Sequence, residues 1–175
     1  PPERNLSLVN RLEPWRKDAN IVAVGLDSAE AGYPAHRHKE AFRRARELGY
    51  YLTAHAGEAY GPVSIWDSLD EAGCGRIDHG VRAVEDPELV NRLDHIFLTV
   101  CPLSNLALKV FPDMEHHSIK QLMDAGVPVS INSDDPPFFC GDLNENYEAV
   151  VRTFRLAKPE LHALAKSAFT NSYAP

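Results

Sequence analysis

The sequence has little of what would mark a disulfide-stabilised, membrane-spanning or nucleic-acid-binding protein. Its three cysteines are odd in number and form no Cys-x-x-Cys pair, which argues against a disulfide framework or a cysteine-rich zinc site and favours a reducing compartment such as the cytoplasm. No apolar run reaches the roughly 18 residues of a membrane helix, and the first residues carry no signal-peptide pattern. The net charge of −7 repels phosphate backbones, so neither a membrane nor a nucleic acid is the expected partner.

Apolar runs alternate with helical patterns along the chain. Buried strands are expected at residues 21–26, 50–55, 76–79, 96–100 and 127–131. Helices are expected at residues 36–48, 65–72, 86–93, 119–126, 142–157 and 159–169. This alternation predicts an α/β protein with a parallel sheet, in a single domain over residues 1–175. Two architectures stay open: a doubly wound sheet, or most of a barrel whose first units are absent.

Polar groups follow four of the expected strands at the point where each strand stops. These groups are His-Ala-Gly-Glu at 55–58, Arg-Ile-Asp-His-Gly at 76–80, Cys-Pro-Leu-Ser-Asn at 101–105 and Ser-Ile-Asn-Ser-Asp-Asp-Pro at 130–136. In a barrel of alternating strands and helices, catalytic groups collect at this edge. The series therefore predicts a functional site built from several strand ends.

Two histidines and a glutamate are the first candidates at this edge. His55 can ligate a metal through a ring nitrogen, and Glu58 can turn back over the same site, where a carboxyl group suits proton transfer. His79 precedes Gly80, which permits a close approach. The alternatives are a core histidine with a surface glutamate, and a hydrogen-bonded histidine that closes a strand.

The adjacent carboxylates Asp134 and Asp135 form the second candidate group. Two such groups are costly to bury together unless they are paired or bind a metal. Because neighbours in a strand point in opposite directions, one aspartate is expected to face a metal and the other a substrate. The alternative is a helix N-cap beside an acid in a loop.

The remaining histidines and large side chains are expected to be structural. His36 and His38 lie in a loop that opens a helix and are interpreted as solvated surface residues. The pair at 116–117 precedes a helix, so its second histidine is expected to cap the helix or to line the barrel mouth. Cys101 and Trp66 are interpreted as packing residues.

The motifs together resemble those of the adenosine/adenine deaminase family, metal-dependent (β/α)8 barrels of the amidohydrolase superfamily. The resemblance covers residues 20–175. It rests on GLDSAE (25–30), HAGE (55–58), RIDHG (76–80), CPLSN (101–105) and SINSDDP (130–136), which occur in the family's order.

The resemblance implies a role for each matched residue. His55 and Asp134 would ligate Zn²⁺, which makes its bound water acidic enough to attack the purine C6. Glu58 would protonate the purine N1, and His79 would orient or deprotonate the water. Ammonia then leaves. The residues implied to bind the substrate are Asp135, which would bond the purine N7, with Glu30, Gly57 and Asp27.

One departure from the family concerns the metal. The family's first strand supplies two more ligands from a His-x-His pair, and no strand-borne pair is present here. A catalytic zinc ion takes three protein ligands or more, and His55 with Asp134 makes two. The chain is therefore expected to hold the C-terminal five or so β/α units, as a fragment, a truncated version or a decayed copy. By itself it is expected to be inactive.

The segment around Glu30 indicates the substrate. Adenosine deaminases tend to place a glycine there, whereas this segment, and the Asp78 of RIDHG, resemble adenine deaminases more closely. Free adenine carries an N–H on its imidazole edge, which the Glu30 carboxylate would accept, whereas a nucleoside would leave this carboxylate unpaired. Adenine, a small-molecule purine, is the expected substrate. Adenosine, another aminopurine derivative, amide hydrolysis, and a barrel fragment without catalysis stay as alternatives.

Overall fold

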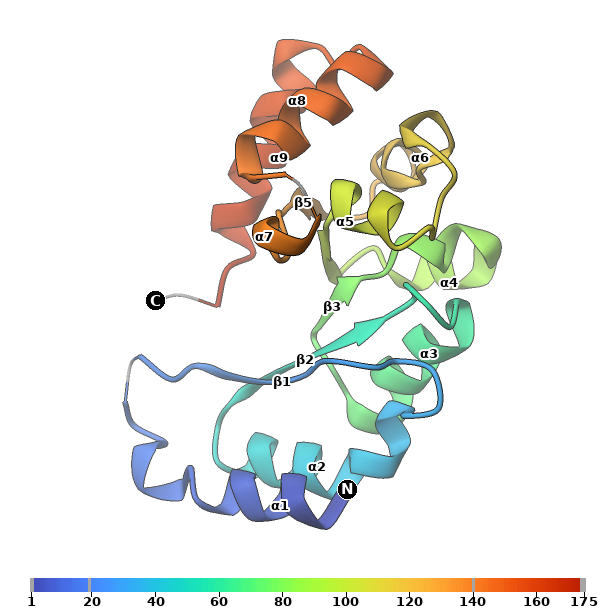
Figure 1. Cartoon of the computed structure of the whole chain (residues 1–175). Coiled ribbons are helices and arrows are strands. Elements are labelled where there is room, and N and C mark those ends of the chain that lie inside the picture. Colours follow the sequence, from blue (N-terminus) through green and yellow to red (C-terminus); the bar gives the residue numbers. More distant parts are fainter. Residues whose placement is uncertain (1, 19, 140, 174–175) are drawn as a thin grey trace.

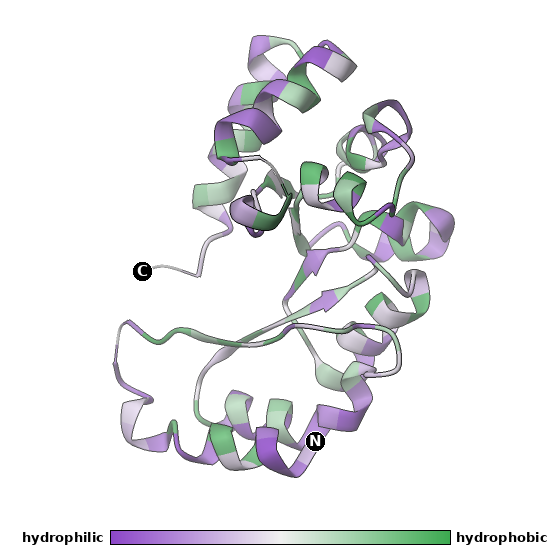
Figure 2. Cartoon of the chain, viewed as in Figure 1, coloured by the Kyte–Doolittle hydropathy of each residue, from purple (hydrophilic) through white to green (hydrophobic). Residues whose placement is uncertain are grey.

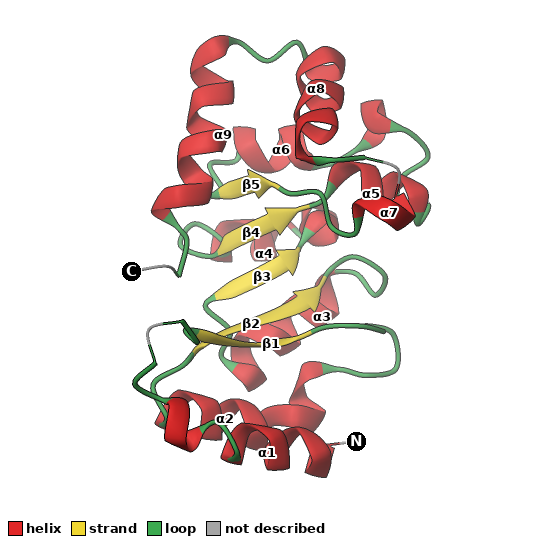
Figure 3. Cartoon of the chain, turned by 60° about the vertical axis from the view of Figure 1, so that its left-hand side comes forward, coloured by secondary structure: helices red, strands yellow, loops and turns green. Residues whose placement is uncertain are grey.

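Five parallel strands form one sheet in the computed structural model, which describes residues 2–18, 20–139 and 141–173 (Figures 1 and 3). The strands are β1 (Ala23–Leu26), β2 (Tyr51–Ala56), β3 (Arg76–His79), β4 (Phe97–Val100) and β5 (Val129–Ile131). All five lie where the sequence predicts them, and β1 and β5 each begin two residues later than expected. The α/β prediction is confirmed.

One helix precedes the first strand, and the other helices follow the strands. They are α1 (Pro2–Asn10), α2 (Lys39–Glu47), α3 (Pro62–Asp67), α4 (Pro87–Arg92), α5 (Pro102–Ala107), α6 (Ile119–Asp124), α7 (Pro136–Phe139), α8 (Leu143–Phe154) and α9 (Lys158–Thr170). The sequence patterns did not predict α5 and α7, which begin at prolines two residues after the end of β4 and five residues after the end of β5. The predicted helix over 36–48 divides into a 3₁₀ turn, Ala35–His38, and α2. The predicted helix over 65–72 ends in a π-helical turn, Ser68–Ala72.

The strand order decides between the two architectures. The strands pair in chain order, β1-β2-β3-β4-β5, and all pairings are parallel. A doubly wound sheet reverses its strand order at a switch point, whereas a barrel adds each strand beside the last. Helices α2, α3 and α4 lie along one side of the curved sheet (Figure 1). This order excludes the doubly wound alternative and fits part of a barrel.

The core lies between the sheet and its helices. Alternate residues of β2 (Leu52, Ala54 and Ala56) are fully buried, and the core continues through Phe42 of α2 and Ile65 of α3. Since strand residues alternate between faces, Thr53 and His55 belong to the opposite, inner face. Figure 2 shows hydrophilic residues at the carboxyl ends of the central strands β2 and β3. The packing that hides the outer face thus aims polar side chains at the inner one.

Several smaller expectations can be compared with this structure. Asp86 caps α4 by accepting from the backbone N–H groups of Glu88 and Leu89, as predicted. Trp66 packs against the core, and its indole N–H donates to Asp86 Oδ2 (2.9 Å). Cys74 and Cys101 are buried and unpaired, and Cys140 lies outside the described residues. In the part of the chain that the structure describes, no helix has the length and hydropathy of a membrane span.

Candidate active site

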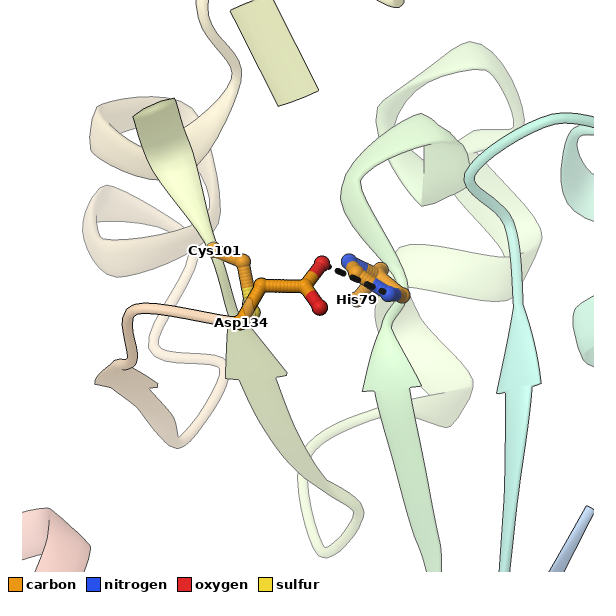
Figure 4. A group of neighbouring side chains, drawn as sticks. All are labelled: His79, Cys101 and Asp134. Atoms are coloured by element: carbon orange, nitrogen blue, oxygen red, sulfur yellow. Dashed lines mark ion pairs between the residues drawn. The ribbon is translucent and has the colours of Figure 1, made fainter. Parts of the chain in front are cut away.

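Residues from three strand ends converge at the carboxyl edge of the sheet. His79 Nδ1 lies 3.3 Å from Glu58 Oε1, and His79 Nε2 lies 4.0 Å from Asp134 Oδ2 (Figure 4). The ring of His55 packs edge-on against His79, with 4.9 Å between centroids. The structure therefore brings together the four residues to which the sequence assigns catalysis and metal binding.

His79 reaches this cluster because its backbone leaves the strand conformation. A regular strand would point Asp78 and His79 to opposite faces. His79 instead has φ 68°, a left-handed conformation that is uncommon for a residue with a side chain. Gly80 follows with φ 69°, and a Cβ there would lie 2.8 Å from the Leu98 side chain. Glycine adopts this conformation freely, whereas strain at a residue such as His79 is typical of functional sites, where it orients a side chain.

Glu58 lies in a largely buried position. Its carboxylate accepts a hydrogen bond from Asn105 Nδ2 (2.6 Å), and its side chain is 14% exposed. Burial raises the pKa of Glu58 to about 7, and the hydrogen bond from Asn105 opposes this rise. A carboxyl group with this pKa holds its proton for much of the time near neutral pH and can donate it to a substrate.

His79 has the complementary property. Burial, with a smaller contribution from the neighbouring His55, lowers its pKa to about 4. The imidazole is therefore neutral near pH 7 and can accept a proton. Glu58 and His79 form a pair whose environments move their pKa values in opposite directions relative to their ordinary values, which is the pattern of an acid and a base in one site.

Asp134 has a geometry that differs from the prediction. It lies three residues beyond the end of β5, with φ 58°, so a left-handed turn and not the alternation of a strand sets its direction. Ser104 Oγ donates to Asp134 Oδ2 (2.7 Å). Asp135 is exposed and directly precedes α7. The prediction that the two aspartates point in opposite directions along a strand is therefore wrong, because β5 ends at Ile131, before both of them.

Two of these residues offer the donor atoms that a metal needs. A histidine nitrogen and a carboxylate oxygen, from His55 and Asp134, are typical zinc ligands. His55 Nδ1 is a buried nitrogen without a hydrogen-bond partner among the described residues, 3.9 Å from Asp78 Oδ2. The donor types thus fit a metal, whereas two ligands are fewer than a catalytic zinc ion takes.

Cys101 is a further neighbour of this cluster. Its Sγ lies with a ligand atom of His79 and one of Asp134 in a group whose members are all within 4.8 Å of one another (Figure 4). Burial raises the pKa of the Cys101 thiol, and Sγ contacts the carbonyl oxygen of Thr99 at 3.8 Å. Since the thiolate is the metal-binding form, the interpretation of Cys101 as a packing residue fits this environment.

Asn105 is the central residue that the sequence analysis missed. It is fully buried and donates to Glu58, lies 3.4 Å from His79 Nδ1, and contacts His117 Nε2 through Oδ1 (3.2 Å). His117 is buried, and its Nδ1 accepts from the N–H of Ile119 at the start of α6. The last residue of the CPLSN motif was the available signal, but only the fold shows that it connects three elements.

The histidines at 36 and 38 have different environments. His36 is exposed, as predicted, and its Nδ1 lies 2.8 Å from Asp67 Oδ1. The prediction of a solvated surface position is wrong for His38, which is 7% exposed and bonds Asn5 Nδ2 at 3.0 Å. The reason is α1, which packs over α2 and covers His38, a contact that a local pattern does not reveal.

The predicted substrate-binding residues lie around the cluster in different ways. Gly57 has φ 69°, and a Cβ there would lie 2.3 Å from Ile65 Cδ1, so the position requires glycine. The carboxylate of Glu30 lies on the backbone of residues 57–60. Asp27 is exposed at the end of β1, where it lines a cavity of about 170 Å³ beside α1. Among the described residues, no hydrogen bond or ion pair joins Asp27 to the cluster.

Comparison with known proteins agrees with this geometry. The adenine deaminase of Cupriavidus necator is 44% identical over all of this chain and half of its own length. That of Acinetobacter baylyi is 47% identical over 89% of this chain and 47% of its own. The chain thus spans about half the length of the curated relatives it matches.

Solved structures give the same result for the fold. An adenine deaminase from Arthrobacter aurescens superposes with a TM-score of 0.93 at 35% identity, over 99% of this chain and 53% of its own. An amidohydrolase from Burkholderia ambifaria with bound Zn superposes with a TM-score of 0.90 at 26% identity, over 99% and 49%. The family model for adenosine deaminase matches residues 2–175, and the chain belongs to this family.

Proposed function

We propose that the protein to which this chain belongs hydrolyses adenine to hypoxanthine and ammonia. The proposal is supported by the 44% and 47% identity to two adenine deaminases. The single observation that carries it is the contact between Glu58 and His79, 3.3 Å apart and with pKa values displaced in opposite directions. Hydrolytic deamination needs such a pair, because one group must give a proton to the ring and another must manage the protons of water.

We propose that His55 and Asp134 hold a zinc ion, together with ligands from outside residues 1–175. Their donor atoms are of the types that zinc takes, and a structural relative contains bound Zn. When bound, zinc makes water acidic enough to serve as a nucleophile near neutral pH. Ser104 orients Asp134 through its hydrogen bond to Oδ2, and the left-handed backbone holds the carboxylate toward His79.

The chain's own residues would manage the protons. Glu58, held by Asn105, gives its proton to the purine N1, so that the ring accepts the electron pair displaced from C6 as the C6–O bond forms. His79, neutral at pH 7, orients the attacking water and accepts a proton from it. The C6–N6 bond then breaks, and the amino group leaves as ammonia after it receives a proton.

We propose that Asp135, Gly57 and Asp27, the predicted substrate residues other than Glu30, lie near the purine. Asp135, exposed beside Asp134, is a candidate for the purine N7, and Gly57 permits the ring to approach the backbone. Asp27 has the least support because it lines the cavity beside α1. The reaction would serve purine salvage. The cytoplasm is the proposed compartment, since the described cysteines Cys74 and Cys101 are unpaired.

A hybrid enzyme tests the function directly. Residues 1–175 replace the matching half of the Cupriavidus necator adenine deaminase, and ammonia release from adenine and from adenosine is measured beside the zinc content. We expect turnover of adenine with kcat/KM well above that for adenosine. A folded, zinc-loaded hybrid that turns over adenosine and not adenine would overturn the choice of substrate, and one that turns over neither would overturn the proposed function.

A further inference from the structure

The Glu30 carboxylate is surrounded by protein donors. It accepts hydrogen bonds from four successive backbone N–H groups, those of Gly57 (2.6 Å), Glu58 (3.2 Å), Ala59 (2.6 Å) and Tyr60 (3.2 Å). The buried hydroxyl of Ser64 donates to it as well. A carboxylate has about four acceptor positions on its two oxygens. Protein donors therefore occupy both oxygens of Glu30.

These N–H groups belong to the segment that carries the proposed acid. Residues 57–60 connect the end of β2 to α3, and no backbone carbonyl pairs with their N–H groups in the described hydrogen bonds. Gly57 and Gly61 both have positive φ, at 69° and 82°. Successive N–H groups in such a turn form a concavity that binds an anion. Glu30 supplies that anion from the loop after β1, 27 residues earlier in the sequence than Gly57.

We infer that Glu30 is a positioning residue, which fixes the backbone at Glu58 so that the Glu58 carboxyl meets Asn105 and His79. The inference rests on the proposed function of Glu58 as the proton donor. It replaces a contact between Glu30 and the purine by a contact between Glu30 and the loop. The distances favour the loop, because the imidazole N–H of adenine needs an acceptor that is free, and Glu30 has both oxygens engaged.

The charge of Glu30 supports the same role. Burial is the main cause of the raised pKa of Glu58, and the negative charges of Asp134 and Glu30 raise it further, while Asn105 and His55 lower it. Glu30 thus fixes the place of the proposed acid and favours its protonated form. A side chain that only filled space would do neither.

Glu30→Gln tests the inference in two ways. The amide keeps the size of the side chain. Its NH₂ group, however, is a donor and cannot accept a hydrogen bond from the backbone N–H groups that it faces. In the 175-residue chain, we expect hydrogen–deuterium exchange of the amides at 57–60 to accelerate about tenfold or more, as for the loss of a charge-assisted hydrogen bond. Glu71→Gln, at an exposed glutamate after α3, is the control and should leave this exchange unchanged.

The hybrid enzyme separates positioning from substrate contact. A misplaced acid lowers kcat, by about 10- to 100-fold for displacements near 1 Å. We expect Glu30→Gln to lower kcat by such a factor, equally for adenine and for any residual adenosine turnover, with KM and zinc content nearly unchanged. A loss confined to adenine would show that Glu30 contacts the purine and would overturn the inference.

A shorter carboxylate covers the case in which Glu30→Gln does not fold. Glu30→Asp keeps the charge but lacks one methylene, so it reaches fewer of the four N–H groups and should accelerate their exchange to a smaller extent. Unchanged exchange at 57–60 in a folded variant would contradict the inference whatever the hybrid does. Since exchange is read without turnover, an inactive hybrid would count against the proposed function and not against the role of Glu30.

Discussion

Two groups of charged residues on the inner face of the sheet can be compared: a group around Asp78, called here the lower level, and a group around Glu58 and His55, called the upper level. They meet where His55 pairs in register with Asp78. At the lower level, Asp78 accepts from Thr53 (2.7 Å) and Thr99 (2.8 Å) and pairs with Arg76 Nε (3.3 Å). At the upper level, His55 Nδ1 has no hydrogen-bond partner among the described residues, and burial raises the pKa of Glu58 to about 7. The carboxylate of Asp78 accepts hydrogen bonds from protein donors. His55 and Glu58 instead have atoms that can still bind a metal or a substrate.

The C-terminal end strengthens the lower level. The ring of Tyr173 stacks on Tyr51 at 4.4 Å between centroids, Arg76 lies over that ring at 4.5 Å, and the Tyr173 hydroxyl donates to Leu52 O. Inner-face charge is therefore compatible with a purely structural role where partners saturate it. Polar atoms that can still bind a metal or a substrate, more than charge or burial, therefore distinguish the candidate site.

The largest expected effect concerns the upper level as a metal site. Residues 1–175 alone should bind zinc weakly and should release no ammonia from adenine, because His55 and Asp134 provide two ligands where a catalytic site takes three. Elemental analysis and an ammonia assay measure both quantities. Stoichiometric zinc with robust turnover would show that other residues complete the ligand set, and His36 and His38 would be the first to replace.

Replacing the carboxyl group of Glu58 by an amide tests whether this residue donates a proton in the reaction. In the hybrid enzyme, Glu58→Gln should lower kcat by about 10²- to 10⁴-fold, the usual worth of a general acid–base residue. The amide keeps the shape, so zinc content should match that of the parent enzyme. Near-normal turnover in the variant would remove Glu58 from the mechanism.

The raised pKa of Glu58 also predicts how stability depends on pH. In metal-free residues 1–175, the unfolded carboxyl releases its proton near pH 4.5, whereas the folded one holds it to about 7. Stability should therefore fall as pH rises between these values, by about 3 kcal/mol in total. Glu58→Gln should lack this component, so the two proteins should differ more in stability at pH 8 than at pH 4. Urea denaturation at both pH values measures the difference, and parallel pH profiles would contradict the prediction.

The smallest effect belongs to the lower level. Thr99→Val removes one donor to Asp78 with little change in shape and should lower the free energy of unfolding by about 1 kcal/mol. Because Asp78 keeps Thr53 and Arg76, kcat of the hybrid should stay within about threefold of the parent value. Urea denaturation measures the change in stability, and steady-state kinetics measures kcat. A large loss of kcat would mean that the two levels act as one unit.

Local sequence patterns were enough to predict the strands and the four residues that converge at one edge of the sheet. Apolar runs identified all five strands, since a strand buried between helices must be hydrophobic. The ends of these runs predicted His55, Glu58, His79 and Asp134 as neighbours, because parallel strands deliver their carboxyl ends to one edge. These are local properties, which a single stretch of sequence carries.

The other features depend on tertiary contacts, which join segments far apart in the chain. Asn105 becomes central when α5 brings it between Glu58 and His117. The left-handed turn at Asp134 and the cover that α1 gives His38 depend on neighbours that no local pattern names. Glu30 is the clearest case: its sequence position suggested a contact with the purine, whereas folding places its carboxylate among four N–H groups that have no other backbone partner. At the buried Gly57, an N–H group without a partner would be costly, and this cost, which exists only in the folded chain, favours the pairing with Glu30.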